Sequence, residues 1–240
     1  MLLLYLSTIA GLATPIGCLI VLLLGEPSEK LFSGLLAGAG GVMLAVITLD
    51  LLPAALSYRQ PLQFLLGLAA GIIFMSLSEK ILQHRYQSSR TSRRTRLKTV
   101  GLLIASGIAL HDIPEGMAIA VGQEATGQLG MIIAVGITLH NLPEGMATAT
   151  PLIMAGIRKT KILALNLAIA FFTPLGAILG KLAISAVQNS LCLLLSLAAG
   201  AMAFLVLTEL IPLAKENHPR QALLGGLSGY IFFVLLSLFM

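Results

Sequence analysis

The sequence predicts an all-α membrane protein that forms a single transmembrane domain over residues 1–240. Three observations lead to this fold class. Hydrophobic residues make up 57% of the chain and charged residues only 10%, whereas soluble domains contain about 25% charged residues. Apolar runs of about 20 residues, the length needed to cross a bilayer, recur eight times. Glycine is abundant, with 24 residues, as closely packed transmembrane helices require.

The apolar runs place the eight expected helices. They lie near residues 2–24, 31–56, 62–83, 99–122, 128–154, 162–184, 190–213 and 221–239. Polar or charged joints that contain Gly, Pro, Ser or Asn separate most of them. The first run has no basic segment before it and is long enough to span, so we interpret it as a retained helix and not as a cleaved signal peptide. The longest joint is a basic loop, residues 84–98.

Basic residues predict the orientation of these helices. If the loop 84–98 is cytoplasmic, 13 of the 15 Lys and Arg residues lie at cytoplasmic helix ends, and only Arg59 and Lys181 lie on the other side. Such a bias is typical of cytoplasmic ends. We therefore expect a multi-pass protein of the plasma membrane with both termini outside. No nucleic-acid partner is expected, because nothing aromatic stands beside the arginines. A lipid-headgroup contact by the loop remains open.

Three pairs of helices repeat one another along the chain. Residues 14–17 (Thr-Pro-Ile-Gly) return as 173–176 (Thr-Pro-Leu-Gly). Residues of the second helix recur at the same spacing in the seventh helix, and residues of the third helix recur in the eighth. The offsets of the three helix pairs are 159, 159 and 158 residues in turn. The first and sixth helices enter the membrane from opposite sides, so the repeat is inverted. This predicts a 3+2+3 arrangement, helices 1–3 and 6–8 around a central 4/5 pair, which is typical of transporters with a binding site near the midplane.

The central pair carries one polar motif twice. His111-Asp112-Ile-Pro-Glu115-Gly in the fourth helix returns as His140-Asn141-Leu-Pro-Glu144-Gly in the fifth. Ionisable groups at this depth are costly and usually functional. On a helix, residues three and four apart share a face, so each glutamate lies beside its own histidine and the residue after that histidine.

Two facing helices of this kind would bring together two ligand clusters. The first contains His111, Glu115, His140 and Glu144, and the second contains Asp112, Glu115, Asn141 and Glu144. The shared glutamates suggest a bridged two-metal site. Imidazole with carboxylate suits zinc, iron, manganese or cobalt better than calcium or magnesium. The simpler alternative is that the histidines and glutamates pair across the helices as structural hydrogen bonds.

Two residue types flank these ligands in both helices. Pro114 and Pro143 each leave the carbonyl four residues earlier without its helical donor, which is tolerated in a membrane where that carbonyl meets protein or lines a wet cavity. Gly116 and Gly145 follow the glutamates and would allow a backbone or an ion to come close.

The doubled His-x-x-Pro-Glu-Gly motif within eight helices resembles the ZIP family of divalent-metal transporters. The resemblance covers nearly the whole chain. It implies uptake of zinc or related metals into the cytoplasm, through a binuclear site between helices 2, 4, 5 and 6. It also implies a rocking or elevator-like movement of a transport bundle. The family's ligands correspond to the six motif residues.

Three positions matter to this comparison. Asp112 stands where the family usually has Asn, which makes the second cluster more acidic. Thr173 stands where the sixth helix often carries Glu, so a carboxylate of the second metal is missing. Met43 matches a position that can supply a thioether, a ligand that favours softer metals. Helix packing is the alternative role for Met43, because Met202 repeats it where no metal is expected.

Two further acids lie inside the apolar spans. The predicted topology places Asp50 in the outer half of the second helix and Glu209 in the inner half of the seventh. Related by the repeat, they could form the outer and inner stations of a cation path. Alternatively, each pairs with a polar group and holds the bundle together.

The predicted function is transport of divalent metal, most favourably zinc, with iron, manganese, cobalt and cadmium as alternatives. The metal is cargo, no cofactor is expected, and the protein is not expected to be an enzyme. The alternative is an intramembrane metal-dependent hydrolase, since a His/Glu cluster could activate water; a metal sensor is less favoured. Expected partners are the metal ion and the lipid bilayer. A homodimer stays open, because the pairs Gly67/Gly71 and Gly225/Gly229 would let their helices approach a second chain, although packing within one chain would use them equally.

Overall fold

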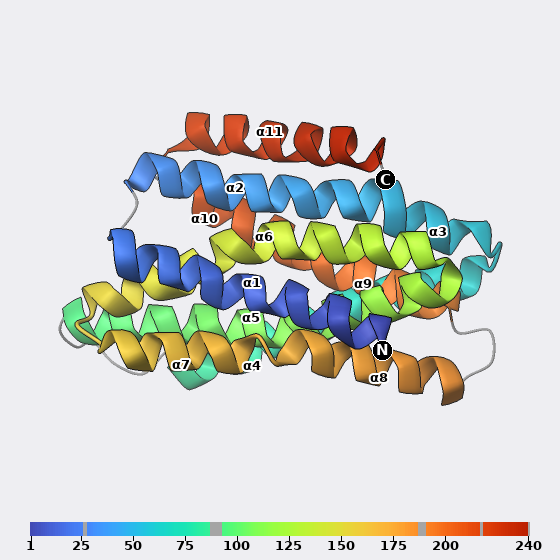
Figure 1. The fold of residues 1–240 in the computed structure, drawn as a ribbon, viewed down its shortest axis with the longest axis horizontal. Helices are drawn as coiled ribbons and strands as arrows, with labels where there is room; N and C mark the ends of the chain where they lie inside the picture. Colours follow the sequence, from blue (N-terminus) through green and yellow to red (C-terminus); the bar gives the residue numbers. More distant parts are fainter. Residues whose placement is uncertain (26–27, 87–92, 187–190, 217, 240) are drawn as a thin grey trace.

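The computed structural model describes residues 1–240 except 26–27, 87–92, 187–190, 217 and 240. All regular structure in the described part is helical. The helices run along one common axis and form an elongated bundle (Figure 1), and both chain termini lie at the same end of it. The predicted eight crossings would produce the same placement of the termini.

Thirteen helical elements follow one another in the described part of the chain. They are α1 (Leu2–Leu24), α2 (Glu29–Ala45), the π-helical η1 (Val46–Leu51), α3 (Leu52–Ser57), α4 (Pro61–Tyr86), α5 (Arg93–Ala125), α6 (Gly127–Met154), α7 (Lys159–Ile169), α8 (Phe172–Ala186), α9 (Leu191–Leu205), the π-helical η2 (Val206–Leu210), α10 (Ile211–Lys215) and α11 (Pro219–Ser237).

Within the described residues, seven stretches are long and apolar enough to cross a membrane. They are Leu2–Leu24, Glu29–Ser57, Pro61–Ile81, Leu97–Ala125, Lys159–Ala186, Leu191–Lys215 and Pro219–Ser237. The remaining long helix, α6, has 28 residues, carries the second polar motif and is not among these seven stretches. It packs against α1, α2 and α5 inside the bundle. The prediction of an all-α membrane protein is therefore confirmed, with seven to eight spans.

Some predicted bounds are wrong. The basic loop predicted at 84–98 is shorter, because α4 continues to Tyr86 and α5 already begins at Arg93. Of that loop, residues 87–92 lie outside the described part of the chain. The predicted sixth span consists of two helices, since α7 ends at Ile169 and α8 begins at Phe172. Pro174 explains this break, because its ring clashes with the carbonyl of Ala170 and supplies no N–H to it.

The second and seventh spans each contain a π-helical turn just before a proline. The N–H of Leu52 bonds to the carbonyl five residues back, at Ile47, and the N–H of Ile211 bonds in the same way to Val206. Pro53 and Pro212 follow directly. In each π-helical turn a threonine hydroxyl donates to the carbonyl four residues back, Thr48 at 2.7 Å and Thr208 at 2.8 Å. Such turns are rare and often mark functional positions.

The helices pack in matching pairs. The helix α2 packs on α11 and α9 on α4, while α1 packs on α6 and α8 on α5. Glycines permit these close approaches, since a Cβ at any of them would collide with backbone of the facing helix. The contacts are Gly225 on Gly34, Gly229 on Gly38, Gly67 on Leu193, and Gly71 on Leu197. The residues that these glycines face are equivalent in the two halves of the chain: Gly34 corresponds to Leu193 and Gly38 to Leu197, each at an offset of 159 residues. The two halves of the chain thus use equivalent glycine contacts.

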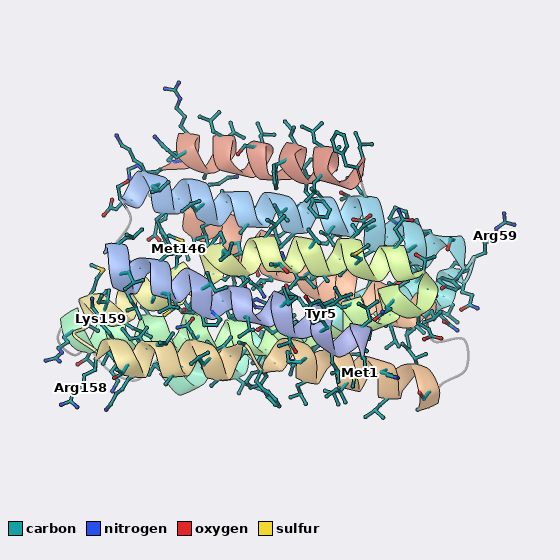
Figure 2. All side chains as sticks on the ribbon, in the orientation of Figure 1. Met1, Tyr5, Arg59, Met146, Arg158 and Lys159 are labelled. Atoms are coloured by element: carbon teal, nitrogen blue, oxygen red, sulfur yellow. The ribbon has the colours of Figure 1, made fainter. Side chains whose placement is uncertain are left out.

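The surface of the bundle fits a bilayer. Large apolar side chains such as Leu65 of α4 and Leu224 of α11 are more than half exposed, and these two helices lie at the periphery. Lipid tails are as apolar as leucine, so their exposure to a bilayer carries no hydrophobic cost. The cations lie at the ends: Arg158 and Lys159 are at one end of the bundle and Arg59 at the other (Figure 2).

Candidate metal centre

The two polar motifs meet in the middle of the bundle, where α5 and α6 pack side by side. All six motif side chains are buried, with exposed fractions of at most 2%; they are His111, Asp112, Glu115, His140, Asn141 and Glu144. The helices continue through Pro114 and Pro143. The predicted convergence of the two motifs is therefore present in the structure.

Each histidine contacts the glutamate of the other helix. His111 Nε2 lies 3.3 Å from Glu144 Oε2, and His140 Nε2 lies 2.9 Å from Glu115 Oε1. These reciprocal pairs are the contacts that the simpler, structural alternative predicted. They satisfy only one nitrogen of each ring and one oxygen of each carboxylate, so they do not account for the whole set of polar atoms.

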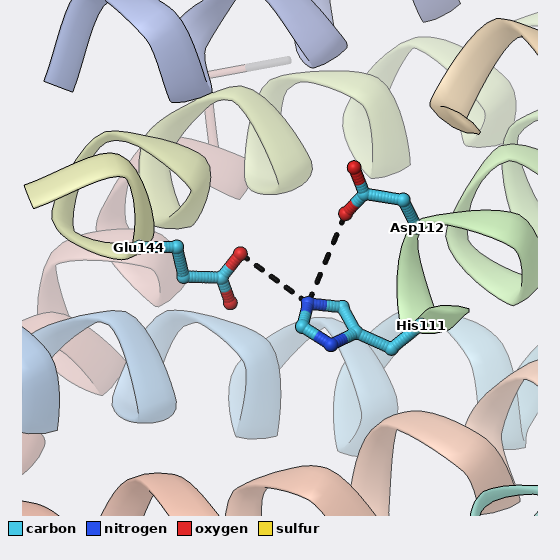
Figure 3. Close-up of side chains that lie close together, drawn as sticks. All are labelled: His111, Asp112 and Glu144. Carbon is cyan, nitrogen blue, oxygen red and sulfur yellow. Dashed lines mark hydrogen bonds and ion pairs between the residues drawn. The ribbon is translucent and has the colours of Figure 1, made fainter. Parts of the chain in front are cut away.

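Asp112 joins one of these pairs. Its Oδ1 lies 3.8 Å from His111 Nε2, and His111, Asp112 and Glu144 each offer one ligand atom within 4.8 Å of the others. Figure 3 shows the imidazole of His111 between the two carboxylates. From the sequence, Asp112 was predicted to belong to the second cluster and His111 to the first. Because these two side chains contact each other, the two clusters lie closer together than the helical spacing alone suggested.

Many ligand atoms at the centre have no hydrogen-bond partner among the described residues. They are the Nδ1 atoms of His111 and His140, Oε2 of Glu115, Oε1 of Glu144, both carboxylate oxygens of Asp112, and Oδ1 of Asn141. A buried polar atom without a partner costs about 1–3 kcal/mol, and more when it is charged. A cation is the partner that carboxylate and carbonyl oxygens and an unprotonated ring nitrogen all accept. The donor set therefore fits a metal ion.

Contacts with α1 and α8 hold the motif side chains and backbone in place. The amide Nδ2 of Asn141 donates to Ala10 O of α1 at 2.9 Å, which leaves the Oδ1 of Asn141 available to a cation. A Cβ at Gly145 would collide with Thr14 O of α1, and one at Gly116 would collide with Thr173 O of α8. These glycines therefore allow the backbone approach that the sequence predicted for them.

Two threonines lie against the motif helices, Thr14 at Gly145 and Thr173 at Gly116. The hydroxyl of Thr173 is buried and has no hydrogen-bond partner among the described residues. The hydroxyl of Thr14 is equally buried and also has no partner among the described residues. Thr14 is a functional candidate that was not predicted from the sequence, although its offset of 159 from Thr173 indicates it.

Of the remaining predicted residues, Glu209 has a contact near this centre, whereas Asp50 and Met43 are described only by their burial. Glu209 is next to the centre: its Oε2 is 3.8 Å from the place that a Cβ on Gly107 would occupy, one turn before His111. Asp50 lies in η1, and its Oδ2 is buried without a partner among the described residues. Met43 is fully buried in the main apolar core together with Met202. The proposed roles of Asp50 and Met43 as cation ligands therefore stay predictions.

Comparison with known proteins identifies the family. The family model described as ZIP Zinc transporter matches residues 78–237, a stretch that contains both motifs. The chain belongs to the ZIP zinc transporter family. As a ZIP protein it is a multi-pass membrane transporter of metal ions and not an enzyme.

Bacterial ZIP proteins match the chain over nearly all of its length. The zinc transporter ZupT of Enterobacter sp. (strain 638) is 33% identical over 239 residues, covering 94% of this chain and 93% of the relative. The zinc transporters ZupT of Salmonella paratyphi A (strain ATCC 9150 / SARB42) and Salmonella newport (strain SL254) are each 32% identical over 241 residues, with the same coverage.

Proposed function

We propose that the protein carries zinc into the cytoplasm through a two-metal site between α5 and α6. The observation that carries this proposal is the group of six buried motif side chains, most of whose ligand atoms have no other partner among the described residues. The ZIP family and the zinc transporters ZupT support zinc as the cargo. Iron, manganese, cobalt and cadmium accept similar donors and remain alternatives.

The reciprocal His–Glu pairs would let the site empty and refill. Without metal, each imidazole N–H donates to the opposite glutamate, which reduces the cost of leaving four ionisable groups buried. An arriving ion would replace these hydrogen bonds by coordination; a ring that coordinates through Nε2 gives up its Nε2 proton, which its partnerless Nδ1 can take. Departure of the ion would reverse this proton shift and let the hydrogen bonds form again. Transport requires binding that is favourable enough for entry and weak enough for release. Such an exchange reduces the difference in free energy between the metal-bound and the metal-free site.

The second metal would bind to oxygen ligands. Asp112, Asn141 and Thr173 offer oxygens only, and Thr173 supplies a hydroxyl where the related pattern often has a carboxylate. We therefore propose that this second site binds metal more weakly than the His-containing site, with the charge of Asp112 partly replacing the missing carboxylate. Thr14 of α1 is a fourth residue with a candidate oxygen.

The inverted repeat supplies a route through the bundle. Spans 1–3 and 6–8 would be related by it around α5 and α6, and the matching glycine contacts support this. In this arrangement Asp50 is the outer station, the motif residues form the central site, and Glu209, next to His111, is the inner station. The distribution of Lys and Arg supports termini outside and entry of metal into the cytoplasm. Met43 is the least supported ligand, because it is packed in the core.

A metal-dependent hydrolase is not favoured. Hydrolysis needs an open coordination position and access for both water and substrate. The six motif side chains are at most 2% exposed, and the chain belongs to a transporter family.

Zinc uptake into proteoliposomes tests the proposal. We expect uptake to fall to the level of empty liposomes in both Glu115→Gln and Glu144→Gln, because each variant removes a bridging carboxylate and keeps its volume. Glu124→Gln, at the end of α5 and outside the motif, is the matched control and keeps the wild-type rate. Size-exclusion chromatography checks that each variant is folded. Wild-type rates in both motif variants would show that the ions cross elsewhere, and no uptake by folded wild type would reject transport.

A further inference from the structure

A cavity lies at the end of the bundle that we assign to the cytoplasm. It has a volume of about 290 Å³ and is formed by α5, α7 and the chain around the end of α6. This is close to the lower limit of about 300 Å³ for small-ligand pockets. Two lysines, Lys98 and Lys161, stand over an apolar floor; the floor consists of Leu102, Leu152, Ile157, Ile162 and Leu165.

The two lysines differ from the cations beside them. Arg94 donates through Nε to Ala155 O at 2.7 Å, and Lys159 donates through Nζ to Leu22 O at 2.6 Å, so both bind the carbonyl ends of neighbouring helices. Neither Lys98 nor Lys161 takes part in an ion pair among the residues that the structure describes. Two positive charges therefore line one cavity without an anion.

The cavity changes from charged to apolar along the helix axes. Lys98 and Lys161 lie within the first three residues of the apolar spans Leu97–Ala125 and Lys159–Ala186. The ends of a helix that crosses a bilayer meet the headgroup region. Leu102 and Leu165 each follow their lysine by four residues, so each lies on the same helix face one turn deeper. The charged rim and the apolar floor are thus arranged in the order of a lipid headgroup and its acyl chain.

We propose that this cavity binds an anionic phospholipid of the cytoplasmic leaflet. The phosphate lies between the ammonium groups of Lys98 and Lys161, and the first part of one acyl chain covers Leu102 and Leu165. Charge complementarity selects an anionic headgroup, since basic pockets between transmembrane helices on this side attract such lipids. The apolar floor selects a lipid over a soluble phosphate, which would leave that floor uncovered.

Native mass spectrometry of the purified protein, titrated with phosphatidylglycerol, tests this proposal. We expect Lys98→Gln/Lys161→Gln to bind the lipid about thirtyfold more weakly, which corresponds to about 1 kcal/mol for each lysine. The control Lys30→Gln/Arg220→Gln removes the same charge at the same end of the bundle and keeps wild-type affinity. Phosphatidylcholine binds weakly to all three proteins.

Three outcomes would overturn the proposal. Equal affinity of the Lys98/Lys161 variant and the wild type would remove the cavity as the site. Equal binding of phosphatidylcholine would remove the selection for an anionic headgroup. Binding of glycerophosphoglycerol, the headgroup without chains, as tightly as the whole lipid would show a soluble-anion site instead. The binding measurement needs no transport, so it stands or fails independently of the proposed zinc uptake.

Discussion

At the scale of single residues, the centre is defined by pairs that cross between α5 and α6. His111 with Glu144 and His140 with Glu115 form two equivalent contacts, so neither helix holds a complete ligand set alone. Asp112 breaks the equivalence, because its counterpart on α6 is the neutral Asn141. The extra negative charge lies within 3.8 Å of His111. The two halves of the centre should therefore differ in their affinity for cations.

Replacing Asp112 by Asn tests this difference, since the change removes the charge and keeps the shape. We expect purified Asp112→Asn to bind one zinc ion where the wild type binds two, because the oxygen-only site loses its main anion. Zinc uptake should continue at a reduced rate through the remaining His/Glu ligands. Elemental analysis of the equilibrated protein measures the stoichiometry, and Glu124→Gln, which removes an acid at the end of α5 and outside the motif, is the control. Two ions bound to Asp112→Asn would contradict the assignment of this residue.

At the scale of helices, close packing depends on glycines whose partners are backbone atoms. A carbonyl oxygen cannot move away as a flexible side chain can, so a methyl group there must separate the two helices. The pairs Gly67/Gly71 and Gly225/Gly229 are used in this way inside the chain, against α9 and α2. They therefore supply no argument for the predicted homodimer, which stays a prediction.

Two adjacent glycines of α11 provide a matched test of this packing. A Cβ at Gly225 would overlap Gly34 O, whereas a Cβ at Gly226 would lie 3.6 Å from Ala37 O, an ordinary contact. We expect Gly225→Ala to destabilise the protein by about 1–3 kcal/mol through overpacking. Gly226→Ala should be neutral or slightly stabilising, because alanine is the better helix former. Thermal unfolding in one detergent measures both variants, and equal melting temperatures would show that α2 and α11 separate at no cost.

At the scale of the whole molecule, charge and helix order together predict one orientation. Arg158 and Lys159 mark the end assigned to the cytoplasm, and Arg59 marks the other (Figure 2). The proposed direction of transport and the proposed lipid site both depend on this orientation. It is a property of the protein in a bilayer, which the packing of the helices alone does not determine.

Cysteine labelling in intact cells tests the orientation. Cys18 and Cys192 are buried, so the wild type should label weakly with an impermeant maleimide. Ser57→Cys, at the end marked by Arg59, should label from outside, and Thr160→Cys should label only after permeabilisation. Both positions are exposed, which makes them comparable. The reverse pattern would place the basic residues outside and would overturn the predicted direction of metal movement.

Much of this molecule could be predicted from its sequence because a bilayer imposes simple requirements. Spans need about 20 apolar residues, so their order was readable and their bounds were correct to a few residues over most of the chain. The six motif residues were readable because ionisable groups are rare in such runs. The break between α7 and α8 and the π-helical turns before Pro53 and Pro212 were not predicted, because they change hydrogen bonding without changing hydropathy.

By itself, the sequence determined the helical fold class, the doubled motif and the chemical nature of its ligands, since each depends on composition or on spacing along one helix. Only the tertiary structure decided that His111 contacts Glu144, that Asp112 joins them, that Thr14 lies near this centre, and that Lys98 and Lys161 share a cavity. These relations depend on the rotation and depth of one helix against another. Packing across the bundle sets both, through contacts between residues far apart in the chain, and no pattern within a single helix records them.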